Sequence, residues 1–332
     1  MYQQFYGLND LPFELTPNPS YLFLTARQRE ALSTLQYGLS AAKPFTLLVG
    51  EAGTGKTTLL RAALESERCR AVHCVYLNNP ALTPNDFVTL LATRFGLTAA
   101  AAQSKAVMLD ELEQHLRERH ARGQITALVV DEAQSLSPDL LEEIRLLANI
   151  ETDTQKLLPL VLAGQPELAA RLESPGLRQL KQRVTLRCDL TPFDLPDTAA
   201  YIAARVTKAG GAPSSLFTRQ AVTLVHERSH GIARTINVIC DNALVTGMAL
   251  GRQPVDCSIV LEVCRDLALT PHKRASAASP HSIGAADDSN GDPGPSAGTP
   301  EPPDESAKPW RRTFRSWFRR RPDETQMTVL SE

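Results

Sequence analysis

The feature that most constrains this 332-residue chain is a mostly apolar run that leads directly into a glycine-rich loop and a helix start. Residues 45–49 predict a strand buried on both faces of a parallel sheet. Residues 50–57 follow the pattern G-x-x-x-x-G-K-S/T, in which backbone N–H groups converge on a phosphate. A glycine-rich turn without a ligand is the alternative, and the strand before and helix after argue against it. The loop residues expected to bind a nucleotide are Gly50, Glu51, Ala52, Gly53, Thr54, Gly55, Lys56, Thr57 and Thr58.

A second apolar run, residues 127–130, ends in two adjacent carboxylates, Asp131 and Glu132. At the C-terminal edge of a parallel sheet, Asp131 would face the same crevice as the loop. One carboxylate there can hold Mg²⁺ through its water shell, and the next can polarise an attacking water. An acidic helix cap is the alternative, but Ser137, followed by Pro138, is the better cap. Together the two motifs predict an ATPase that uses ATP and Mg²⁺.

Composition agrees with a cytoplasmic enzyme. The length leaves room for two domains and a tail, and 42% hydrophobic residues suffice for a sizeable core. The formal net charge of −2 creates no global basic field, which argues against a nucleic-acid partner. The six cysteines are scattered without a C-x-x-C pair, which predicts reduced thiols. No apolar run approaches the ~18 residues of a membrane span, and no signal-peptide pattern is evident.

Strand and helix patterns alternate between residues 41 and 190, which predicts an α/β core with a parallel, doubly wound five-stranded sheet. After residue 191 the strand patterns stop, and helical patterns predict an all-α domain over residues 191–270. The expected strands are residues 45–49, 71–77, 127–130, 157–163 and 184–190, and the expected helices of the second domain lie near 196–209, 218–230, 232–247 and 256–268.

The ends of the chain differ from this core. Residues 1–24, rich in aromatic residues and proline, are expected to form an ordered arm without a regular element. Thr25 then starts a helix through a capping-box pattern, so that residues 1–40 precede the core. Residues 271–307 have few large apolar side chains and predict a disordered linker. Residues 323–332 are expected to be a disordered tail.

Residues 308–322 form a basic segment, with Pro309 able to start a helix and Pro322 able to stop it. Its aromatic residues fall on one face of such a helix, and arginines surround them. This pattern predicts a peripheral contact with an anionic membrane at the inner face of the cytoplasmic membrane. A solvated basic tail, or an arginine-rich contact with a protein or nucleic acid, remains open. The aromatic residues are Trp310, Phe314, Trp317 and Phe318.

Several further segments are more discriminating than the two nucleotide motifs. With them the chain resembles, over about residues 1–268, the AAA+ ATPases and within these the ExeA-like group of general secretion pathway protein A. The resemblance implies a P-loop AAA+ core and a helical lid. The segments are Met1-Tyr2, Phe5-Tyr6-Gly7-Leu8, Pro12-Phe13, Leu15-Thr16-Pro17, Tyr37-Gly38-Leu39, Gly164-Gln165-Pro166-Glu167-Leu168, Gln182-Arg183 and Gly231-Ile232-Ala233-Arg234-Thr235-Ile236-Asn237.

The resemblance also implies roles for individual residues. Lys56 would contact the β- and γ-phosphates, Thr57 and Asp131 would organise Mg²⁺, and Glu132 would be the general base. Gln165 matches the sensor 1 position, where a polar side chain orients the attacking water. A turn residue before a proline is the alternative for Gln165.

Two arginine roles follow from the same resemblance. Arg234 matches the sensor 2 arginine of the lid, with a solvent-facing helix arginine as the alternative. Arg183 lies just before the fifth expected strand, where such ATPases place an arginine finger that acts on a neighbouring subunit. Because Arg178 and Arg187 lie close by in sequence, either could be the finger instead, and a merely solvated basic face remains open.

The resemblance implies a homo-oligomer that assembles or remodels a secretion, pilus or exopolysaccharide export apparatus. Members of the group often continue into a membrane span and a peptidoglycan-binding domain. This chain shows a linker and a basic segment instead, which favours the shorter pilus- or export-associated relatives. A DNA-associated ATP switch of the transposition or origin-recognition type is the alternative function. A nucleotide-binding scaffold without turnover is disfavoured by the presence of Glu132.

Overall fold

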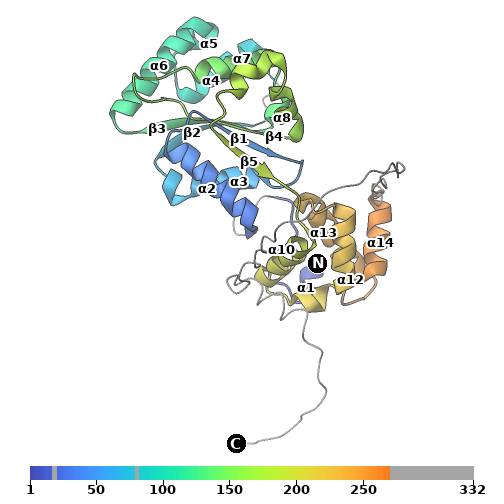
Figure 1. Ribbon diagram of the computed structural model, residues 1–332. Helices are drawn as coiled ribbons and strands as arrows, with labels where there is room; N and C mark the ends of the chain where they lie inside the picture. Colours follow the sequence, from blue (N-terminus) through green and yellow to red (C-terminus); the bar gives the residue numbers. More distant parts are fainter. Residues whose placement is uncertain (17–20, 79–81, 270–332) are drawn as a thin grey trace, which may run out of the picture. The chain divides into compact units, whose positions relative to one another are not determined.

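Five parallel strands form the centre of the fold, in the order β2-β3-β4-β1-β5 (Figure 1). The predicted α/β class with a parallel five-stranded P-loop core is confirmed. Because β1 and β3 both pair in parallel with β4, the two strands that carry the nucleotide motifs end at the same edge of the sheet. The strands are β1 (Phe45–Gly50), β2 (Val72–Leu77), β3 (Ile125–Val130), β4 (Leu160–Gly164) and β5 (Leu186–Leu190).

The computed structural model describes residues 1–16, 21–78 and 82–269. Residues 1–270 form one compact unit. The linker predicted at 271–307, the basic segment predicted at 308–322 and the tail predicted at 323–332 lie outside the described residues.

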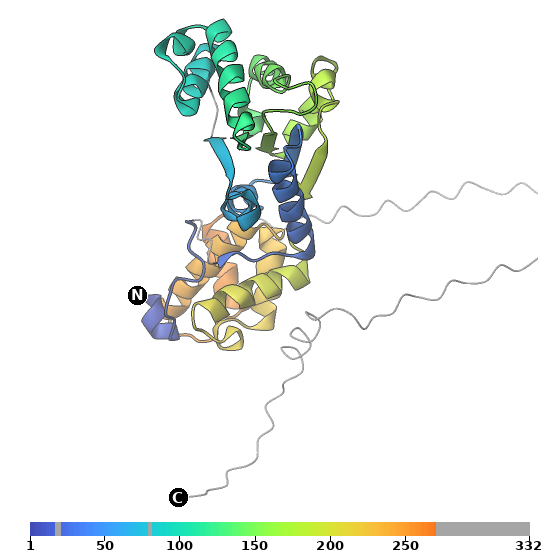
Figure 2. The same cartoon turned by 90° about the vertical axis from the view of Figure 1, so that its left-hand side faces the viewer.

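Helices cover both faces of the sheet. Successive residues of a strand point to opposite faces, so Leu47 and Val49 enter one apolar cluster and Leu48 enters the other. Helices α2 and α3 lie on one face and α4, α6 and α7 on the other (Figure 1), and the perpendicular view shows the same division (Figure 2). The helices of this part are α2 (Ala26–Ser40), α3 (Lys56–Glu65), α4 (Pro84–Phe95), α5 (Ala99–Gln103), α6 (Lys105–Ala121), α7 (Pro138–Leu147), α8 (Pro166–Leu172) and α9 (Arg178–Lys181), with short 3-10 turns η2 (Glu67–Cys69), η3 (Ala133–Ser135) and η4 (Pro175–Leu177).

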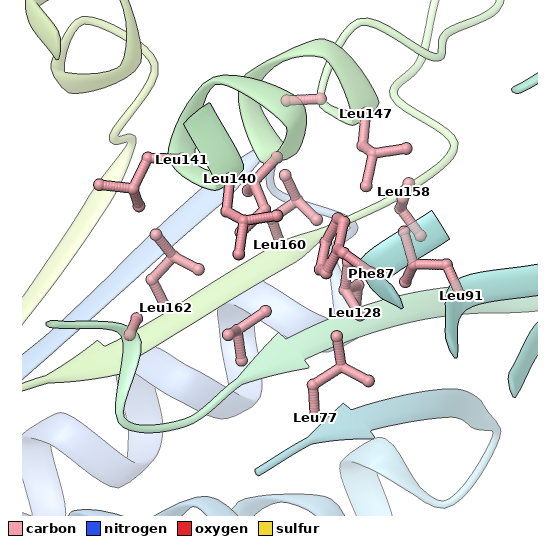
Figure 3. Close-up of a cluster of buried hydrophobic side chains, with 14 of the residues drawn as sticks. Leu77, Phe87, Leu91, Leu128, Leu140, Leu141, Leu147, Leu158, Leu160 and Leu162 are labelled. Atoms are coloured by element: carbon pink, nitrogen blue, oxygen red, sulfur yellow. The ribbon is translucent and has the colours of Figure 1, made fainter. Parts of the chain in front are cut away.

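The larger cluster packs α4 and α7 against β3 and β4. Leu128 of β3 and Leu160 of β4 lie under Leu140 of α7 and Phe87 of α4 (Figure 3). All four side chains are fully or almost fully buried. Each contributes about 1.5–3 kcal/mol relative to an exposed position. This burial fixes the end of β3, which carries the acidic pair.

The helix starts follow the predicted caps. Thr25 and Gln28 form a capping box at α2, in which each side chain accepts a hydrogen bond from the backbone of the other. The Ser137 side chain accepts the Leu140 N–H at the start of α7, with Pro138 in the first turn. Asp131 and Glu132 are therefore not needed to cap α7, as the sequence predicted.

The N-terminal arm is not irregular throughout, contrary to the prediction. Residues Tyr2–Tyr6 form a short helix, α1, which ends at Gly7 in a left-handed conformation (φ 66°). Tyr2 donates a hydrogen bond to Asp241 (2.6 Å), and Tyr6 contacts the Arg252 carbonyl (3.4 Å). Because both rings are anchored to the α-helical part of the chain, tertiary packing stabilises a helix too short to be predicted from its own sequence.

Strands β2, β4 and β5 begin later than predicted, β2 by a single residue, and α5 was not predicted. Leu157 bonds back to Ile150 (3.1 Å) instead of joining β4. Val184 bonds to Lys181 (3.0 Å) as the chain leaves α9, which delays β5. The short helix α5 escaped prediction because it is a run of alanines without apolar periodicity, started by Thr98.

Between β5 and residue 269 the chain is mainly helical, and the N-terminal segment packs onto this part. The Asn9 N–H donates to the Ala209 carbonyl (2.8 Å). Arg205 donates to the Pro12 carbonyl, and Phe13 packs edge-on against Phe217 (6.0 Å between ring centroids). The aromatic N-terminal block is thus part of the packing of this helical domain. Its helices are α10 (Leu195–Lys208), α11 (Pro213–Leu216), α12 (Arg219–Ser229), α13 (Ala233–Ala249) and α14 (Cys257–Asp266).

We predict that acidification destabilises the fold in part through His115. Its Nε2 atom is buried without a hydrogen-bond partner among the described residues, and its ring packs on Phe95 (6.5 Å). Burial, with nearby Arg119, lowers the pKa of His115 below its ordinary value of 6.5. The unfolded chain therefore binds a proton that the folded chain resists, so stability is lost as the pH falls through about 6.5.

The His115→Leu variant should lose less of its urea midpoint between about pH 7.5 and about pH 5.5 than the parent protein does. Burial also lowers the pKa values of His73 and His226, so part of the pH dependence should remain. His120→Leu, which changes an exposed histidine of the same helix, is the control. Equal losses in the His115→Leu variant and the parent would contradict the prediction.

Candidate nucleotide-binding site

The loop between β1 and α3 curls around the Lys56 ammonium group. Gly53 (φ 81°) and Gly55 (φ 98°) adopt the left-handed conformation that the tight turn requires. Lys56 is only 4% exposed, and its Nζ donates to the carbonyls of Gly50 (2.8 Å) and Glu51 (3.0 Å). Burial lowers the pKa of Lys56, while the nearby carboxylates of Glu132 and Asp131 oppose this. The loop therefore presents a desolvated cation at the C-terminal edge of the sheet.

Asp131 lies at the end of β3 and is fully buried. Its Oδ2 accepts hydrogen bonds from the Thr57 hydroxyl (2.6 Å) and the Tyr76 hydroxyl (2.7 Å), and its Oδ1 accepts the Glu132 N–H (2.9 Å). The structure thus brings Thr57 and Asp131, 74 positions apart in sequence, into direct contact. A buried carboxylate with three donors is held in one orientation.

Tyr76 was not predicted as a site residue. It lies near the end of β2, opposite Val129 of β3. Burial and the hydrogen bond to Asp131 raise the pKa of Tyr76, so its hydroxyl stays protonated and serves as a donor. The sequence showed only that a tyrosine lies near the end of an expected strand. It did not show that this strand pairs with β3, which is what brings Tyr76 to Asp131.

The donor set fits Mg²⁺. Magnesium prefers hard oxygen ligands and is usually bound through one or two carboxylates together with substrate phosphates. Thr57 and Asp131 supply a hydroxyl and a carboxylate beside the phosphate loop. In the described part of the chain, no group of three or more His, Cys, Asp or Glu side chains is arranged to hold a metal ion by itself. These two residues would hold Mg²⁺ together with the phosphates of a nucleotide.

Glu132 follows Asp131 in a left-handed backbone conformation (φ 54°). Its Oε2 accepts a hydrogen bond from the Gln134 side-chain amide (2.6 Å). The Gln134 side-chain carbonyl accepts the backbone N–H of Gln165 at the end of β4 (3.1 Å). Glu132 and Gln165, which the sequence assigned separately, are thus connected through Gln134, a residue that the sequence analysis did not single out.

Arg234 comes to the loop through its backbone. Its N–H donates to the Gly53 carbonyl (3.1 Å) at the start of α13. A Cβ atom on Gly53 would lie 2.8 Å from the Arg234 Cβ, so a glycine is needed where the two segments meet. The arginine predicted for the lid therefore lies beside the phosphate loop.

A cavity of about 300 Å³ opens above the loop. The predicted residues that line it are Gly53, Thr54, Gly55, Lys56, Thr57, Thr58, Glu132 and Arg234. The other predicted site residues, Gly50, Glu51, Ala52, Asp131, Gln165 and Arg183, are not among the lining residues. The volume is at the lower end of the range for small-molecule sites, which run from about 300 to about 1,000 Å³.

The N-terminal segment and the helical domain complete the cavity wall, and of their residues only Arg234 was predicted from the sequence. Tyr21 of the N-terminal segment and Tyr201, Arg205 and Asn237 of the helical domain all line the cavity. The Arg205 guanidinium stacks on the Tyr21 ring (5.0 Å) and donates to the Tyr201 hydroxyl (2.7 Å), which donates in turn to Asn237 (2.9 Å). The sequence shows the aromatic residues before α2, but it does not show that they lie close to the phosphate loop.

Arg183 lies away from the cavity. Its Nη1 donates to the carbonyl of Arg145 near the end of α7 (3.0 Å), and it is partly buried there. Arg178 is exposed, and Arg187 pairs with Asp189 on β5 (2.9 Å). Within one chain, none of the three arginines reaches the phosphate loop, which is compatible with an action on a neighbouring subunit.

The sheet order, the phosphate loop after β1, the acidic pair after β3 and the helical domain beside the loop together define a P-loop NTPase of the AAA+ type. Comparison with known proteins agrees. Residues 40–172 match the model of a family described as an AAA domain. This is an ATPase-type, nucleotide-binding domain.

The chain is 42% identical over 255 residues to the general secretion pathway protein A of Aeromonas hydrophila. The match covers 77% of this chain and 46% of that protein, so the chain spans less than half the length of this relative. The resemblance to the AAA+ ATPases of the general secretion pathway protein A group is therefore confirmed.

Solved structures show the same fold at low sequence identity. One is Cdc6p from Pyrobaculum aerophilum, with a TM-score of 0.61 and 19% identity, over 77% of this chain and 70% of that one. Another is a chain in the structure of Drosophila ORC bound to DNA, with a TM-score of 0.59 and 20% identity, over 78% of this chain and 65% of that one. These likenesses support the fold and carry no argument for the DNA-associated alternative.

Within the described residues, no helix has the length and the apolar composition that crossing a membrane would require.

Proposed function

We propose that the chain hydrolyses ATP to ADP and phosphate in the cavity above the phosphate loop. The observation that carries this proposal is the convergence of a buried ammonium, Lys56, and a buried carboxylate, Asp131, which accepts the Thr57 hydroxyl (2.6 Å), at one edge of the sheet. A cation that donates only to loop carbonyls, beside a carboxylate held in one orientation, matches a site for phosphates and Mg²⁺.

In this mechanism Lys56 and the loop N–H groups would hold the phosphates, and Thr57 and Asp131 would hold the metal ion. Bound Mg²⁺ would neutralise the charge on the phosphate oxygens. Glu132 accepts a proton from the attacking water, and Gln165 orients that water. Arg234 supplies a cation from the helical domain. Turnover requires a base, so the carboxylate of Glu132 at the edge of the cavity favours an enzyme over a scaffold that only binds nucleotide.

The biological role that we propose is the assembly or remodelling of a cell-envelope secretion, pilus or exopolysaccharide export system by a homo-oligomer of this chain. Support comes from the 42% identity to a general secretion pathway protein A. Export-apparatus proteins would be the partners. The position of Arg183 outside its own cavity supports an oligomer, because an arginine finger acts on the site of a neighbouring subunit.

We further propose that the chain associates peripherally with the inner face of the cytoplasmic membrane through residues 308–322. This segment lies outside the described residues, and the proposal rests on its sequence. Aromatic residues at helical spacing and surrounding arginines suit the interface of an anionic bilayer. Each basic residue near such a surface contributes about 1 kcal/mol.

Lys56→Ala should abolish ATP binding, whereas Glu132→Gln should bind ATP and lose turnover. Lys56 holds the phosphates, while Glu132 acts only when water attacks, so binding and chemistry should separate. Measuring the ATP dissociation constant and the rate of phosphate release on each variant tests this. Glu67→Gln, an exposed carboxylate, is the control. Hydrolysis at the parental rate by the Glu132→Gln protein would show that the base is another group.

Arg183→Ala should bind ATP as the parent does and lose the ATPase activity that assembly produces. Loss of an arginine finger typically lowers the rate by about 10³-fold or more. Mixing this variant with Lys56→Ala, which keeps Arg183 but has an inactive site, should restore part of the hydrolysis. Arg178→Ala and Arg187→Ala, tested in parallel, show which arginine acts, and Arg117→Ala on α6 is the control. Absence of recovery in demonstrated mixed assemblies would argue against an action in trans.

The full-length protein should sediment with vesicles that contain anionic lipid at low salt, and a version that ends at Pro303 should not. A variant with serine at Trp310, Phe314, Trp317 and Phe318 keeps the arginines and separates charge from aromatic insertion. Vesicles of neutral lipid are the control. If the full-length and shortened proteins sediment equally, the proposed membrane contact through residues 308–322 is wrong.

A further inference from the structure

Gln134 connects two residues that belong to different strand ends. Its side-chain NH₂ group donates to Glu132 Oε2 (2.6 Å), and its side-chain carbonyl accepts the Gln165 N–H (3.1 Å). A carboxamide side chain can do both at once, because it carries a donor and an acceptor on one planar group. The base after β3 and the turn after β4 are therefore held at a fixed separation by a single amide.

The surroundings hold this amide in place. The Gln134 backbone carbonyl accepts a hydrogen bond from Arg171 of α8 (2.7 Å), the helix that begins directly after Gln165. A Cβ atom on Gly164 would lie 3.0 Å from Gln134 Oε1 and 2.7 Å from Leu168 Cδ2, so the glycine gives the amide room to approach β4. Gln134 is thus fixed at its side chain by both strand ends and at its backbone by α8.

The backbone at Glu132 is also constrained. A non-glycine residue at φ 54° is strained by about 1–2 kcal/mol and persists only where the surroundings enforce it. Here Asp131 Oδ1 accepts the Glu132 N–H (2.9 Å), and Ser135 donates its hydroxyl to the Glu132 carbonyl (2.8 Å). The two backbone hydrogen bonds hold the main chain of Glu132 in place, and the hydrogen bond from the Gln134 amide holds its carboxylate.

We infer that Gln134 is a positioning residue that sets the Glu132 carboxylate relative to the Gln165 turn. This inference rests on the proposed ATPase activity, in which Glu132 takes the proton from water. A general base acts only when its oxygen lies within hydrogen-bond reach of the proton that it removes. Gln134 contributes orientation, and its loss should therefore lower kcat while leaving ATP binding unchanged.

Two variants separate the two hydrogen bonds. Gln134→Glu keeps the shape and the acceptor for the Gln165 N–H, and it replaces the donor to Glu132 by a second carboxylate oxygen. Gln134→Leu removes both bonds. Both should lower kcat about 10- to 100-fold, with the KM and the dissociation constant for ATP within about twofold of the parent. Without nucleotide, hydrogen exchange at the Gln165 amide should be faster in Gln134→Leu and unchanged in Gln134→Glu.

The matched control is Gln114→Glu. Gln114 donates its side-chain amide to Glu118 (3.1 Å) on the exposed face of α6, so the same substitution is made at the same kind of pair away from the site. It should leave kcat, KM and the Gln165 exchange rate unchanged.

A double-mutant cycle tests whether Gln134 acts through Glu132. The Glu132→Gln/Gln134→Leu protein should hydrolyse ATP no more slowly than Glu132→Gln alone. The inference would be overturned by any of three results. These are additive losses in the double variant, a kcat of Gln134→Glu within about twofold of the parent, and a raised KM at constant kcat. Parental activity in Glu132→Gln would instead refute the proposed base, so failure of the proposed function is distinguished from failure of the inference.

Discussion

The hydrogen bond between Thr57 and Asp131 joins the two motifs on which the site depends. It links the loop after β1 to the end of β3, although β4 separates these strands in the sheet. A buried carboxylate is destabilising unless donors satisfy it, and Thr57, Tyr76 and the Glu132 N–H supply three. The position of Asp131 therefore depends on strand register, since a shift of one residue would turn its side chain to the opposite face. The apolar clusters on both faces of the sheet stabilise that register.

The N-terminal segment has a structural role that its aromatic composition alone does not reveal. Residues 1–16 pack on the helical domain through Tyr2, Tyr6 and Phe13, whereas α2, which begins at Ala26, packs on the sheet. Tyr21 lies between these two attachments, on the cavity wall. A segment that carries part of the resemblance to the secretion-associated family thus also joins the helical domain to the nucleotide-binding part.

Much of the fold was predictable because its signals are local. The phosphate loop, the Thr25 and Ser137 caps and the buried strands each depend on residues within about a dozen positions of one another. Tyr76, Gln134 and Arg205 could not be found in this way. Each acquires its role from a partner on another element, Asp131, Gln165 and Tyr21 respectively, and the partnership exists only after the strands are ordered and the helical domain is packed. The α1 helix escaped prediction for the same reason, since its two tyrosines are anchored to α13 and to the turn that follows it.

Charge at the cavity comes from both parts of the chain. Lys56 belongs to the loop, whereas Arg234 and Arg205 belong to the helical domain, and all three line the same space. The Arg234 N–H bond to the Gly53 carbonyl holds the start of α13 against the loop without using the guanidinium (3.1 Å). A ligand with phosphates would therefore meet cations from two domains that a main-chain bond already connects. The negative charge of such a ligand would attract both sets of cations. Binding of the ligand would therefore favour the arrangement in which the helical domain lies close to the loop, and release of the ligand would remove that attraction.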